Sequence, residues 1–421
     1  MRVLIVGAGI GGLSAALSLH EAGIETQIVE AATRLDPIGV GINLLPHAVR
    51  ELTELGLGDE LAATAIPAAE MAHFTRHGDP IWAEPRGIAQ GYRWPQYSIH
   101  RGELQTILLK AVQARLGASA VRTGTAFESF EQDGSGVRAR LRDAATGTFE
   151  TVHCDVLIGA DGIRSAVRAQ LHPGEPGPLW NGVRLWRGLT EGDPFLSGRT
   201  VAVAGSNTAA KLVVYSISPE AEQRGRALLN WSAEVKIVDD GITQAPDVDT
   251  RAGRLEDFLP HFADWRFDWL DVPAMLASTE RILEHSMVDR DPLPFWTQGR
   301  VTLLGDSAHP MYPIGSNGGS QAVLDARVLA FELSHAAAPE DGLASYDKAR
   351  RETVNSIVLA CRDMPADRVL HTVHERAPEG YERIEDVLSA EELATISGAY
   401  RQTSLSDIAT LNERPSLTVR S

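Results

Sequence analysis

The chain of 421 residues has only two cysteines and four lysines, and it has no long apolar run. Two cysteines are too few for a disulfide framework or a zinc site, and they fit a reducing cytoplasm. The histidines and glutamate within residues 371–375 match no metal-ligand spacing, so we expect no metal. No apolar run approaches the roughly 20 residues that cross a bilayer, so we expect no membrane segment. The net charge of −17 argues against a nucleic-acid partner, because binding to phosphate depends on Lys and Arg.

The first 30 residues, MRVLIVGAGIGGLSAALSLHEAGIETQIVE, follow the order strand, glycine turn, helix, strand and acid. This order is typical of a dinucleotide-binding βαβ unit. Gly7 permits the tight turn, Gly9 lets the backbone approach a pyrophosphate, and Gly12 lets the helix pack closely on the strand. The start of the helix offers N–H groups to phosphate, and Glu30 is placed to accept hydrogen bonds from a ribose. The alternative is a glycine-rich turn without a ligand.

Two further buried strands each end beside a glycine and an acid. In DVLIGADGIRSAVR, a strand ends at Asp161, which suits contact with a ribose or pyrophosphate; the alternative is an acid that only caps the next helix. In RVTLLGDSAHPMYPIGSNGGSQAVLDA, a strand ends at Gly305 and Asp306, where the aspartate is placed to bind a ribityl hydroxyl. The loop from Pro313 to Gly318 and the following helix are placed to hold a planar ring system.

A helix is predicted over residues 101–117 from its apolar spacing, with Arg101 in its first turn and Gln105 one turn later. An arginine at that position is placed to reach a phosphate or ribose of a dinucleotide. The alternative is a surface salt bridge with Glu103 or Asp306. We expect His309, in the loop that follows Gly305 and Asp306, to order that loop rather than to act as a base.

These four clusters together resemble the single-component flavoprotein aromatic hydroxylases of the para-hydroxybenzoate hydroxylase type, over about residues 1–365. The segments GVGINLLPHAV, PQYSIHRGELQ, MVDRDPLPFW and SNGGSQAVLDA are similar to those of phenazine-hydroxylating members. The chain departs from the wider family at Ser320, where many members have asparagine. The resemblance assigns to the FAD site Gly7, Gly9, Gly12, Glu30, Val40, Gly41, Arg101, Gln105, Asp161, Gly305, Asp306, Pro313, Gly315 and Gly318.

The resemblance also implies an activity. FAD would be the cofactor, NADH or NADPH the reductant, and O2 the co-substrate. A C4a-hydroperoxyflavin would hydroxylate an aromatic or polycyclic, phenazine-like metabolite, while the protein orients the ring and excludes water. No side chain is assigned a catalytic role, because the flavin performs the chemistry. Two alternatives stay open: a flavin oxidase or reductase without oxygen insertion, and a flavin-loaded protein that sequesters an aromatic ligand.

The order of apolar runs predicts an α/β protein with a Rossmann-like FAD-binding domain and an inserted antiparallel β-sheet domain. The FAD-binding domain is expected to be discontinuous, with strands near residues 2, 28, 156 and 302 in one sheet, and to comprise residues 1–69, 99–175 and 291–365. The substrate-binding β domain would comprise residues 70–98 and 176–290. Residues 366–421 are predicted as a C-terminal helix and tail. A monomer and a homodimer are both compatible with the sequence.

The inserted sheet and the loop before Pro313 are expected to supply the substrate wall. Four aromatic side chains are the candidates for contact with a small aromatic substrate, namely Trp186, Tyr215, Trp231 and Tyr312. Arg187 is the candidate partner of a substrate carboxylate. The alternatives are plain core packing for the aromatic residues and an exposed surface position for the arginine.

Overall fold

The computed structural model describes residues 1–239, 241–246, 249–363, 367–396 and 407–419. Its first layer is a six-stranded sheet with the order β22-β23-β12-β1-β2-β8, in which only the β22–β23 pair is antiparallel. These strands are β1 (Arg2–Val6), β2 (Glu25–Val29), β8 (Val121–Arg122), β12 (Val156–Gly159), β22 (Thr297–Gln298) and β23 (Val301–Leu303). The sheet joins the segments that the sequence predicted to share one sheet.

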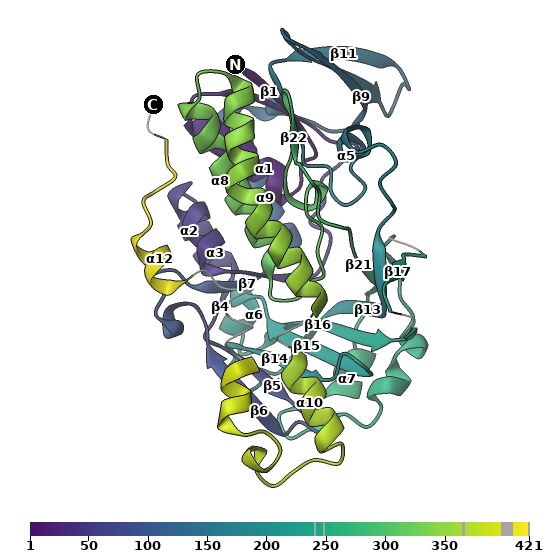
Figure 1. Cartoon of the computed structure of the whole chain (residues 1–421). Helices are drawn as coiled ribbons and strands as arrows, with labels where there is room; N and C mark the ends of the chain where they lie inside the picture. The colour runs from purple at the N-terminus through teal and green to yellow at the C-terminus, as the bar shows by residue number, and fades with distance from the viewer. Residues whose placement is uncertain (240, 247–248, 364–366, 397–406, 420–421) are drawn as a thin grey trace.

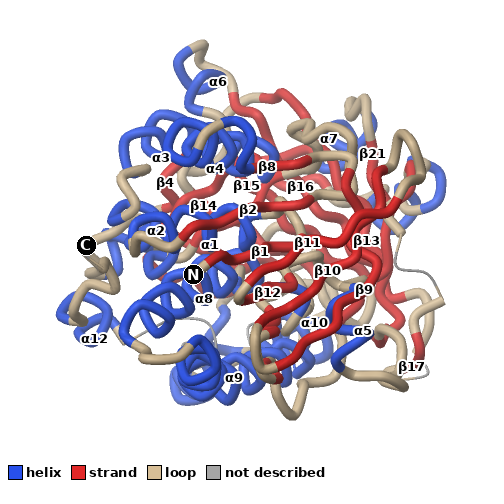
Figure 2. The backbone as a smooth tube through the Cα atoms, turned by 90° about the horizontal axis from the view of Figure 1, so that it is seen from above, coloured by secondary structure: helices blue, strands red, loops and turns tan. Residues whose placement is uncertain are grey.

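Helices and a small sheet pack on this first layer because its central strands are apolar on both faces. The helices are α1 (Ile10–Glu21), α4 (Arg101–Leu116), α8 (Asn317–His335) and α9 (Pro339–Asp363), which pack in the order α4-α1-α8-α9. The small antiparallel sheet consists of β9 (Thr125–Asp133), β10 (Gly136–Asp143) and β11 (Phe149–Cys154), and it contacts β1, β2 and β12. Figure 2 shows these elements gathered around the central strands.

The second layer is a nine-stranded sheet that lies below the first in Figure 1. Its main path is β18-β21-β13-β16-β15-β14-β5-β6, and β17 pairs with β13; the β14–β5 pair is parallel and the others are antiparallel. The strands are β5 (Glu70–Phe74), β6 (Pro80–Pro85), β13 (Leu179–Gly192), β14 (Thr200–Gly205), β15 (Ala210–Ser216), β16 (Ala227–Lys236), β17 (Thr243–Gln244), β18 (Arg251–Ala252) and β21 (Ile282–Asp289).

Short elements connect the two layers. The strands β3 (Gly41–Leu44), β7 (Gln96–His100) and β4 (Ile66–Ala68) form a separate antiparallel sheet. The domain boundary that the sequence predicted between residues 98 and 99 falls inside β7, because this strand pairs with β3 rather than with the large sheet. The remaining short elements are α2 (Pro46–Glu54), α3 (Gly58–Thr64), α5 (Ala166–Leu171), α6 (Pro219–Gln223), α7 (Val272–Ala277), β19 (Arg266–Phe267) and β20 (Leu270–Asp271).

The C-terminal part returns to both layers. Helix α10 (Arg368–Arg376) packs its apolar side chains against the nine-stranded sheet at β14 and β6. Helix α12 (Ile408–Glu413) lies against α2, where Arg50 donates hydrogen bonds to the carbonyl oxygens of Leu411 and Arg414. Of the predicted C-terminal helix and tail, residues 366, 397–406 and 420–421 lie outside the described residues.

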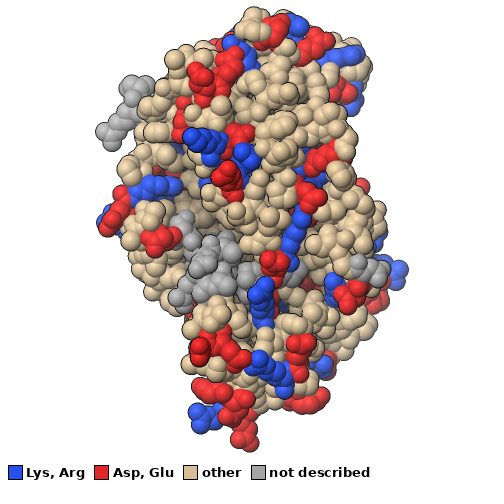
Figure 3. All heavy atoms as spheres, viewed as in Figure 1, with Lys and Arg blue, Asp and Glu red and all other residues tan. Residues whose placement is uncertain are grey.

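The surface carries both charge signs. On the face drawn in Figure 3, Lys and Arg side chains lie interspersed with Asp and Glu, in no continuous basic patch. Among the described residues, no helix has the length and apolar character needed to span a bilayer. In the same part of the chain, no group of His, Cys, Asp and Glu side chains is arranged to hold a metal ion.

Candidate functional site

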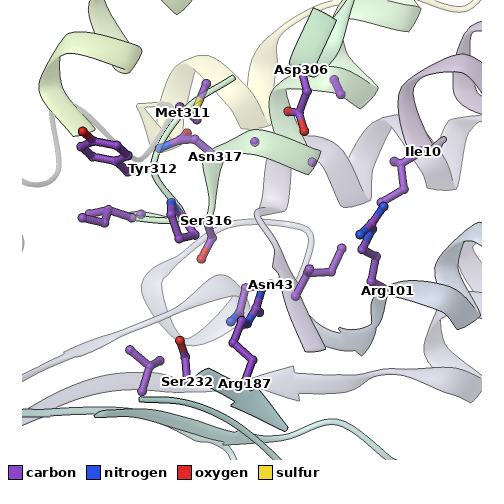
Figure 4. Close-up of a pocket in the computed structure, with 18 of the residues that line it drawn as sticks. Ile10, Asn43, Arg101, Arg187, Ser232, Asp306, Met311, Tyr312, Ser316 and Asn317 are labelled. Atoms are coloured by element: carbon purple, nitrogen blue, oxygen red, sulfur yellow. The ribbon is translucent and has the colours of Figure 1, made fainter. Parts of the chain in front are cut away.

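A cavity of about 440 Å³ lies between the two layers. The segments that follow the carboxyl ends of β1, β12 and β23 line one side, and strands β13, β15 and β16 line the other (Figure 4). A second cavity of about 520 Å³ adjoins it, since Ile42, Arg101 and Arg187 line both. Ligands of open α/β sheets bind outside the carboxyl ends of the strands, and both cavities lie there.

The first glycine turn has the shape of a nucleotide cradle. Gly7 has a φ of 106°, and a Cβ at this position would lie 2.3 Å from the carbonyl oxygen of Ala160. A Cβ at Gly12 would lie 2.1 Å from the carbonyl oxygen of Gly7, so helix and strand are in contact there. Apart from Gly9 and its chain neighbours, no described residue has an atom within 4 Å of the Cβ position of Gly9, which lines the cavity. The turn is therefore tightly packed against the protein at Gly7 and Gly12, while at Gly9 it leaves space for a ligand in the cavity.

Two helices begin at the cavity without a side-chain cap. Helix α1 follows Gly9, and helix α8 follows Ser316, which has a φ of 61°. Neither helix has an acidic residue in its first turn, and the residues at both starts line the cavity. The free N–H groups and the helix dipoles favour negative charge at both places. Two anion-binding ends in one cavity fit a dinucleotide whose pyrophosphate and ring system lie apart.

Glu30 and Gln105 stabilise the first glycine turn through hydrogen bonds to its backbone. The carboxylate of Glu30 accepts hydrogen bonds from the backbone N–H groups of Ala8 and Ala32, both at 2.8 Å. The side-chain amide of Gln105 donates to the carbonyl oxygen of Ala8 at 2.8 Å. A carboxylate has about four acceptor sites, so Glu30 keeps capacity for the hydroxyls of a ribose. Gln105 shapes the glycine turn through the backbone of Ala8.

Arg101 lies at the junction of the two cavities and is exposed there. Among the described residues, its side chain forms no ion pair with Glu103, Asp306 or any other acid, so the surface salt bridge is not formed. In Figure 4 its guanidinium points into the cavity, on the same side as Ile10. The backbone N–H of Arg101 donates to the carbonyl oxygen of Val40 at 2.9 Å, and Val40 lines the second cavity.

A buried ionic network around Asp325 stabilises the Gly305–Asp306 turn. Asp325 accepts hydrogen bonds from the Gly305 N–H at 3.2 Å and from Arg350 Nε at 2.8 Å, and it pairs with His309 Nε2 at 2.6 Å. Burial alone would raise the pKa of Asp325, but His309 and Arg350 together hold it below its ordinary value. His309 therefore orders the loop, as expected. The Asp306 carboxylate is exposed and lines the cavity.

The second acid–glycine turn has a different role. Asp161 accepts hydrogen bonds from the Ser165 hydroxyl at 2.5 Å and the Ala166 N–H at 2.8 Å, at the start of α5. It also accepts one from the Ser307 hydroxyl at 3.2 Å, which ties α5 to the turn that follows β23. The carboxylate thus acts as a cap, which is the alternative that the sequence left open. The neighbouring residues Ala160 and Gly162 line the cavity instead.

The loop proposed for a ring system closes the cavity on one side. Pro313, Gly315 and Gly318 all line it, and Gly315 has a φ of 72°. Ser320, where the chain departs from the family pattern, is fully buried: its hydroxyl accepts a hydrogen bond from the Leu45 N–H and donates one to the Ser316 carbonyl oxygen. Ser320 therefore joins α8 to the segment that follows β3.

Arg187, Tyr215 and Tyr312 line the cavity. Arg187 is half-buried, so the exposed position is wrong; its Nη2 donates to the Gly41 carbonyl oxygen at 2.8 Å and its Nε has no partner among the described residues. Burial raises the pKa of Tyr215 to about 12, partly offset by Arg187 and Asn43. Tyr215 therefore stays protonated at neutral pH.

Trp186 and Trp231 do not reach the cavity. They alternate along β13 and β16 with Arg187 and Ser232, so they lie on the opposite face of the sheet. There both indoles stack on Phe258, at ring-centroid distances of 5.1 and 5.8 Å. The expectation that these two residues face the substrate is therefore corrected in favour of core packing. The sequence indicates that Trp186 and Arg187 point to opposite faces of one strand, but not which face lines a cavity.

Sequence reasoning missed a set of polar residues on the cavity side of the sheet. The signal was present in β16, where three polar residues alternate with apolar ones in the order Asn230, Ser232, Glu234. An alternation of this kind indicates a strand with one wet face. The missed lining residues include Asn43, His73, Lys211, Asn230, Ser232, Glu234 and Asp367.

An α/β protein with two open helix starts at one cavity, and a large sheet across it, has the architecture of a flavoprotein with a discontinuous dinucleotide-binding domain. Comparison with known proteins agrees. Residues 1–183 and 272–360 match a family model described as an FAD binding domain, and the chain belongs to this family.

Two relatives illustrate the family. The chain is 48% identical to the phenazine 1,6-dicarboxylic acid hydroxylase of Lysobacter antibioticus, over 88% of this chain and 91% of the relative. It is 30% identical to 3-hydroxybenzoate 6-hydroxylase 1 of Aquipseudomonas alcaligenes, over 83% of this chain and 84% of the relative. Among solved structures, Klebsiella pneumoniae HpxO with FAD and uric acid matches with a TM-score of 0.75 and 25% identity, over 96% of each chain.

The predicted fold class, the FAD cofactor and the class of FAD-dependent aromatic monooxygenases are thereby confirmed.

Proposed function

We propose that this enzyme hydroxylates a fused-ring aromatic acid of the phenazine type, with NADH or NADPH as reductant and O2 as co-substrate. The relative from Lysobacter antibioticus, which is named for a phenazine acid, supports the ring class. The observation that carries the proposal is the half-buried Arg187 at one edge of a cavity floor that includes Val213 and Val203. An arginine that lines a cavity beside a tyrosine hydroxyl is suited to bind a carboxylate.

The register of the large sheet gives the size of that floor. Arg187 pairs with Ser232, Ser232 with Val213, and Val213 with Val203, all on the cavity side. Neighbouring strands lie about 4.8 Å apart, so the Cα atoms of Arg187 and Val203 are about 14 Å apart. Two valines next to one another offer a flat apolar surface. A floor of this length favours a fused ring system over a single ring.

We propose that FAD lies across the segments that the resemblance assigns to it. The two helix starts would bind its anionic groups, Asp306 its ribityl hydroxyls, and the loop from Pro313 to Gly318 its ring system. Glu30 would bind the ribose and Arg101 the phosphates. Gln105 and Asp161 would act indirectly, because they hydrogen-bond to the backbone of Ala8 and Ala166, and Gly41 would act through its carbonyl oxygen, which holds Arg187. The fit rests on the open helix starts and the exposed Asp306 carboxylate.

Bound FAD supplies hydride acceptance from NAD(P)H and the activation of O2. The side chains of this protein bind and orient the substrate and keep water away. Arg187, anchored on the Gly41 carbonyl oxygen, positions the carboxylate of the substrate. The protonated Tyr215 offers a hydrogen bond beside it. The loop at Pro313 and the sheet enclose the ring between them, which excludes bulk water from the reacting atoms.

We further propose the division into an FAD-binding domain (residues 1–69, 99–175 and 291–365) and a substrate domain (70–98 and 176–290), with the correction at β7. The enzyme would act in the cytoplasm as a monomer or a homodimer, without a nucleic-acid or membrane partner. The net charge of −17 and the interspersed surface charges support this. Light scattering of the purified holoenzyme measures its mass and decides between the two oligomeric states.

The test of the function uses the FAD-loaded protein, NADH or NADPH, and ¹⁸O₂, with phenazine-1-carboxylate as substrate. We expect oxidation of the nicotinamide to depend on the acid, and mass spectrometry to find one labelled oxygen in the product. An oxidase or reductase would give hydrogen peroxide or a reduced acceptor and an unlabelled product. A sequestering protein would bind the acid tightly without turnover. Either result, or activity only on benzoates, would overturn the proposal.

A further inference from the structure

The cavity floor continues past Val203 and ends in a buried polar cluster. His73 pairs with Val203 in the register, which extends the row from Arg187 to about 19 Å between Cα atoms. Lys211 on β15 and Glu234 on β16 lie two residues along their strands from this row, and Asp367 pairs with Lys211; all four residues line the cavity. Their relative exposures are 0%, 3%, 6% and 5% in that order. We call these four residues the far-end group. A buried charged group in the wall of a binding cavity requires an explanation.

The ionic bonds inside the far-end group leave hydrogen-bonding capacity unused. Lys211 Nζ donates to Asp367 at 2.8 Å and to Glu234 at 2.9 Å. An ammonium has three N–H groups, so one has no acceptor among the described residues. The ring of His73 stacks on Trp82 at 5.1 Å, and among the described residues only the Trp82 backbone engages its nitrogens. At least one nitrogen of His73 is therefore unpaired as well.

The charges of the far-end group restrict what can bind there. Burial by itself would lower the pKa of Lys211, but Asp367 and Glu234 hold it above its ordinary value, so the ammonium stays charged. Burial lowers the pKa of His73 to about 4, so its imidazole is neutral at pH 7. Lys211 is thus already paired with both carboxyl groups of the cluster. An added anion would meet like charge at short range, whereas a neutral group would not.

We propose that the far-end group binds a neutral hydrogen-bonding substituent, such as a hydroxyl, a carbonyl or a ring nitrogen, at the end of the substrate remote from Arg187, and that it disfavours a second carboxylate there. This inference rests on the proposed function. The free N–H of Lys211 donates to an acceptor oxygen or nitrogen, and the neutral His73 donates or accepts according to its tautomer. The substrate would then have one acidic end and one neutral polar end.

Equilibrium binding tests this without turnover. The FAD-loaded enzyme is titrated, in the absence of NAD(P)H, with phenazine-1-carboxylate, 6-hydroxyphenazine-1-carboxylate and phenazine-1,6-dicarboxylate, and the flavin spectrum gives each Kd. A net hydrogen bond to a neutral group corresponds to about 2- to 10-fold in Kd. We therefore expect the hydroxy acid to bind about 2- to 10-fold more tightly than the parent acid. We expect the dicarboxylate to bind more weakly than the parent acid.

Two variants assign the effect to the far-end group. His73→Phe keeps a ring on Trp82 but removes both nitrogens, and it should abolish the preference for the hydroxy acid with little effect on the parent acid. Glu234→Gln removes a negative charge, and it should narrow the gap between dicarboxylate and parent acid. His172→Phe is the matched control, because His172 also packs on an aromatic ring, that of Phe295, and has a nitrogen unpaired among the described residues, but it lines neither of the two cavities described above.

The outcomes separate the two proposals. If the wild-type enzyme binds the dicarboxylate as tightly as the parent acid, or if His73→Phe keeps the preference for the hydroxy acid, the role of the far-end group is refuted. The function proposed above survives in that case, provided that phenazine-1-carboxylate binds and is hydroxylated. If none of the three acids binds to the holoenzyme, the substrate class is wrong, and the inference about its far end falls with it.

Discussion

The substitution Arg187→Gln offers the sharpest test of the substrate site. Arg187 is the half-buried cation at the edge of the floor; its Nη2 is anchored on Gly41 and its Nε is unpaired. Hydrogen bonds to charged groups contribute about 1.5–3 kcal/mol, and each 1.4 kcal/mol is tenfold in Kd. We therefore expect the Kd of phenazine-1-carboxylate to rise about 10- to 150-fold. The Kd of unsubstituted phenazine, which has no carboxylate, should change little.

The assay is the titration of the FAD-loaded variant with both ligands, monitored by the flavin spectrum. Arg184→Gln is the matched control, because Arg184 lies on the same strand but pairs with Glu284 at 2.9 Å and lines neither cavity. Arg187→Lys keeps the charge but loses the planar fork, so we expect an intermediate Kd. An equal loss of affinity for both ligands in Arg187→Gln would refute the carboxylate role. So would an unchanged Kd for the acid.

Three further predictions concern the cofactor cradle, the core and pH. In Gly12→Ala, the new Cβ meets the Gly7 carbonyl oxygen at 2.1 Å, so we expect purified protein with little FAD; Gly134→Ala, with open space around its Cβ, should keep the full absorbance at 450 nm typical of bound flavin. Trp231→Phe should lower the melting temperature without changing the Kd of phenazine-1-carboxylate, because this indole is fully buried on the face of the sheet opposite the cavity. A raised Kd would instead indicate that Trp231 contacts the substrate. Burial raises the pKa of Asp289 from 3.8 to about 6, so the native state binds this proton more tightly than the unfolded state, and the contribution of the group to stability falls as pH rises between these values. Urea unfolding of wild type and Asp289→Asn across this range should show a flatter pH dependence in the variant; identical slopes would contradict the shift.

The cofactor side of the site was accessible from sequence because its requirements are local. The roles of Gly7, Gly9 and Gly12 depend on a turn and a helix start within six residues, and their packing in the structure has the expected form. The resemblance to a known family added the order of the four clusters along the chain. Asp161 shows the limit of this reasoning, since a capping acid and a ligand-binding acid have the same local sequence.

The substrate side could not be predicted in the same way. Trp186 and Arg187 are neighbours in sequence but lie on opposite faces of one strand, and only the packing of α7 and Phe258 on one side decides which face is filled. Likewise β7 pairs with β3 and β4 rather than with the large sheet. These outcomes depend on strand register and on layers that meet across long stretches of chain.

The amino-acid sequence alone was enough to predict a dinucleotide-binding turn and a mixed α/β architecture. Its resemblance to a known family further predicted an FAD enzyme that acts on aromatic compounds. Those features rest on short-range geometry, such as a glycine where a side chain would collide with a carbonyl oxygen. Only the tertiary structure decided which side chains face the substrate. It placed Asp367 from the C-terminal segment on Lys211, 156 residues away, at the end of the cavity floor. Contacts over such separations arise from the packing of whole layers, which no local pattern encodes.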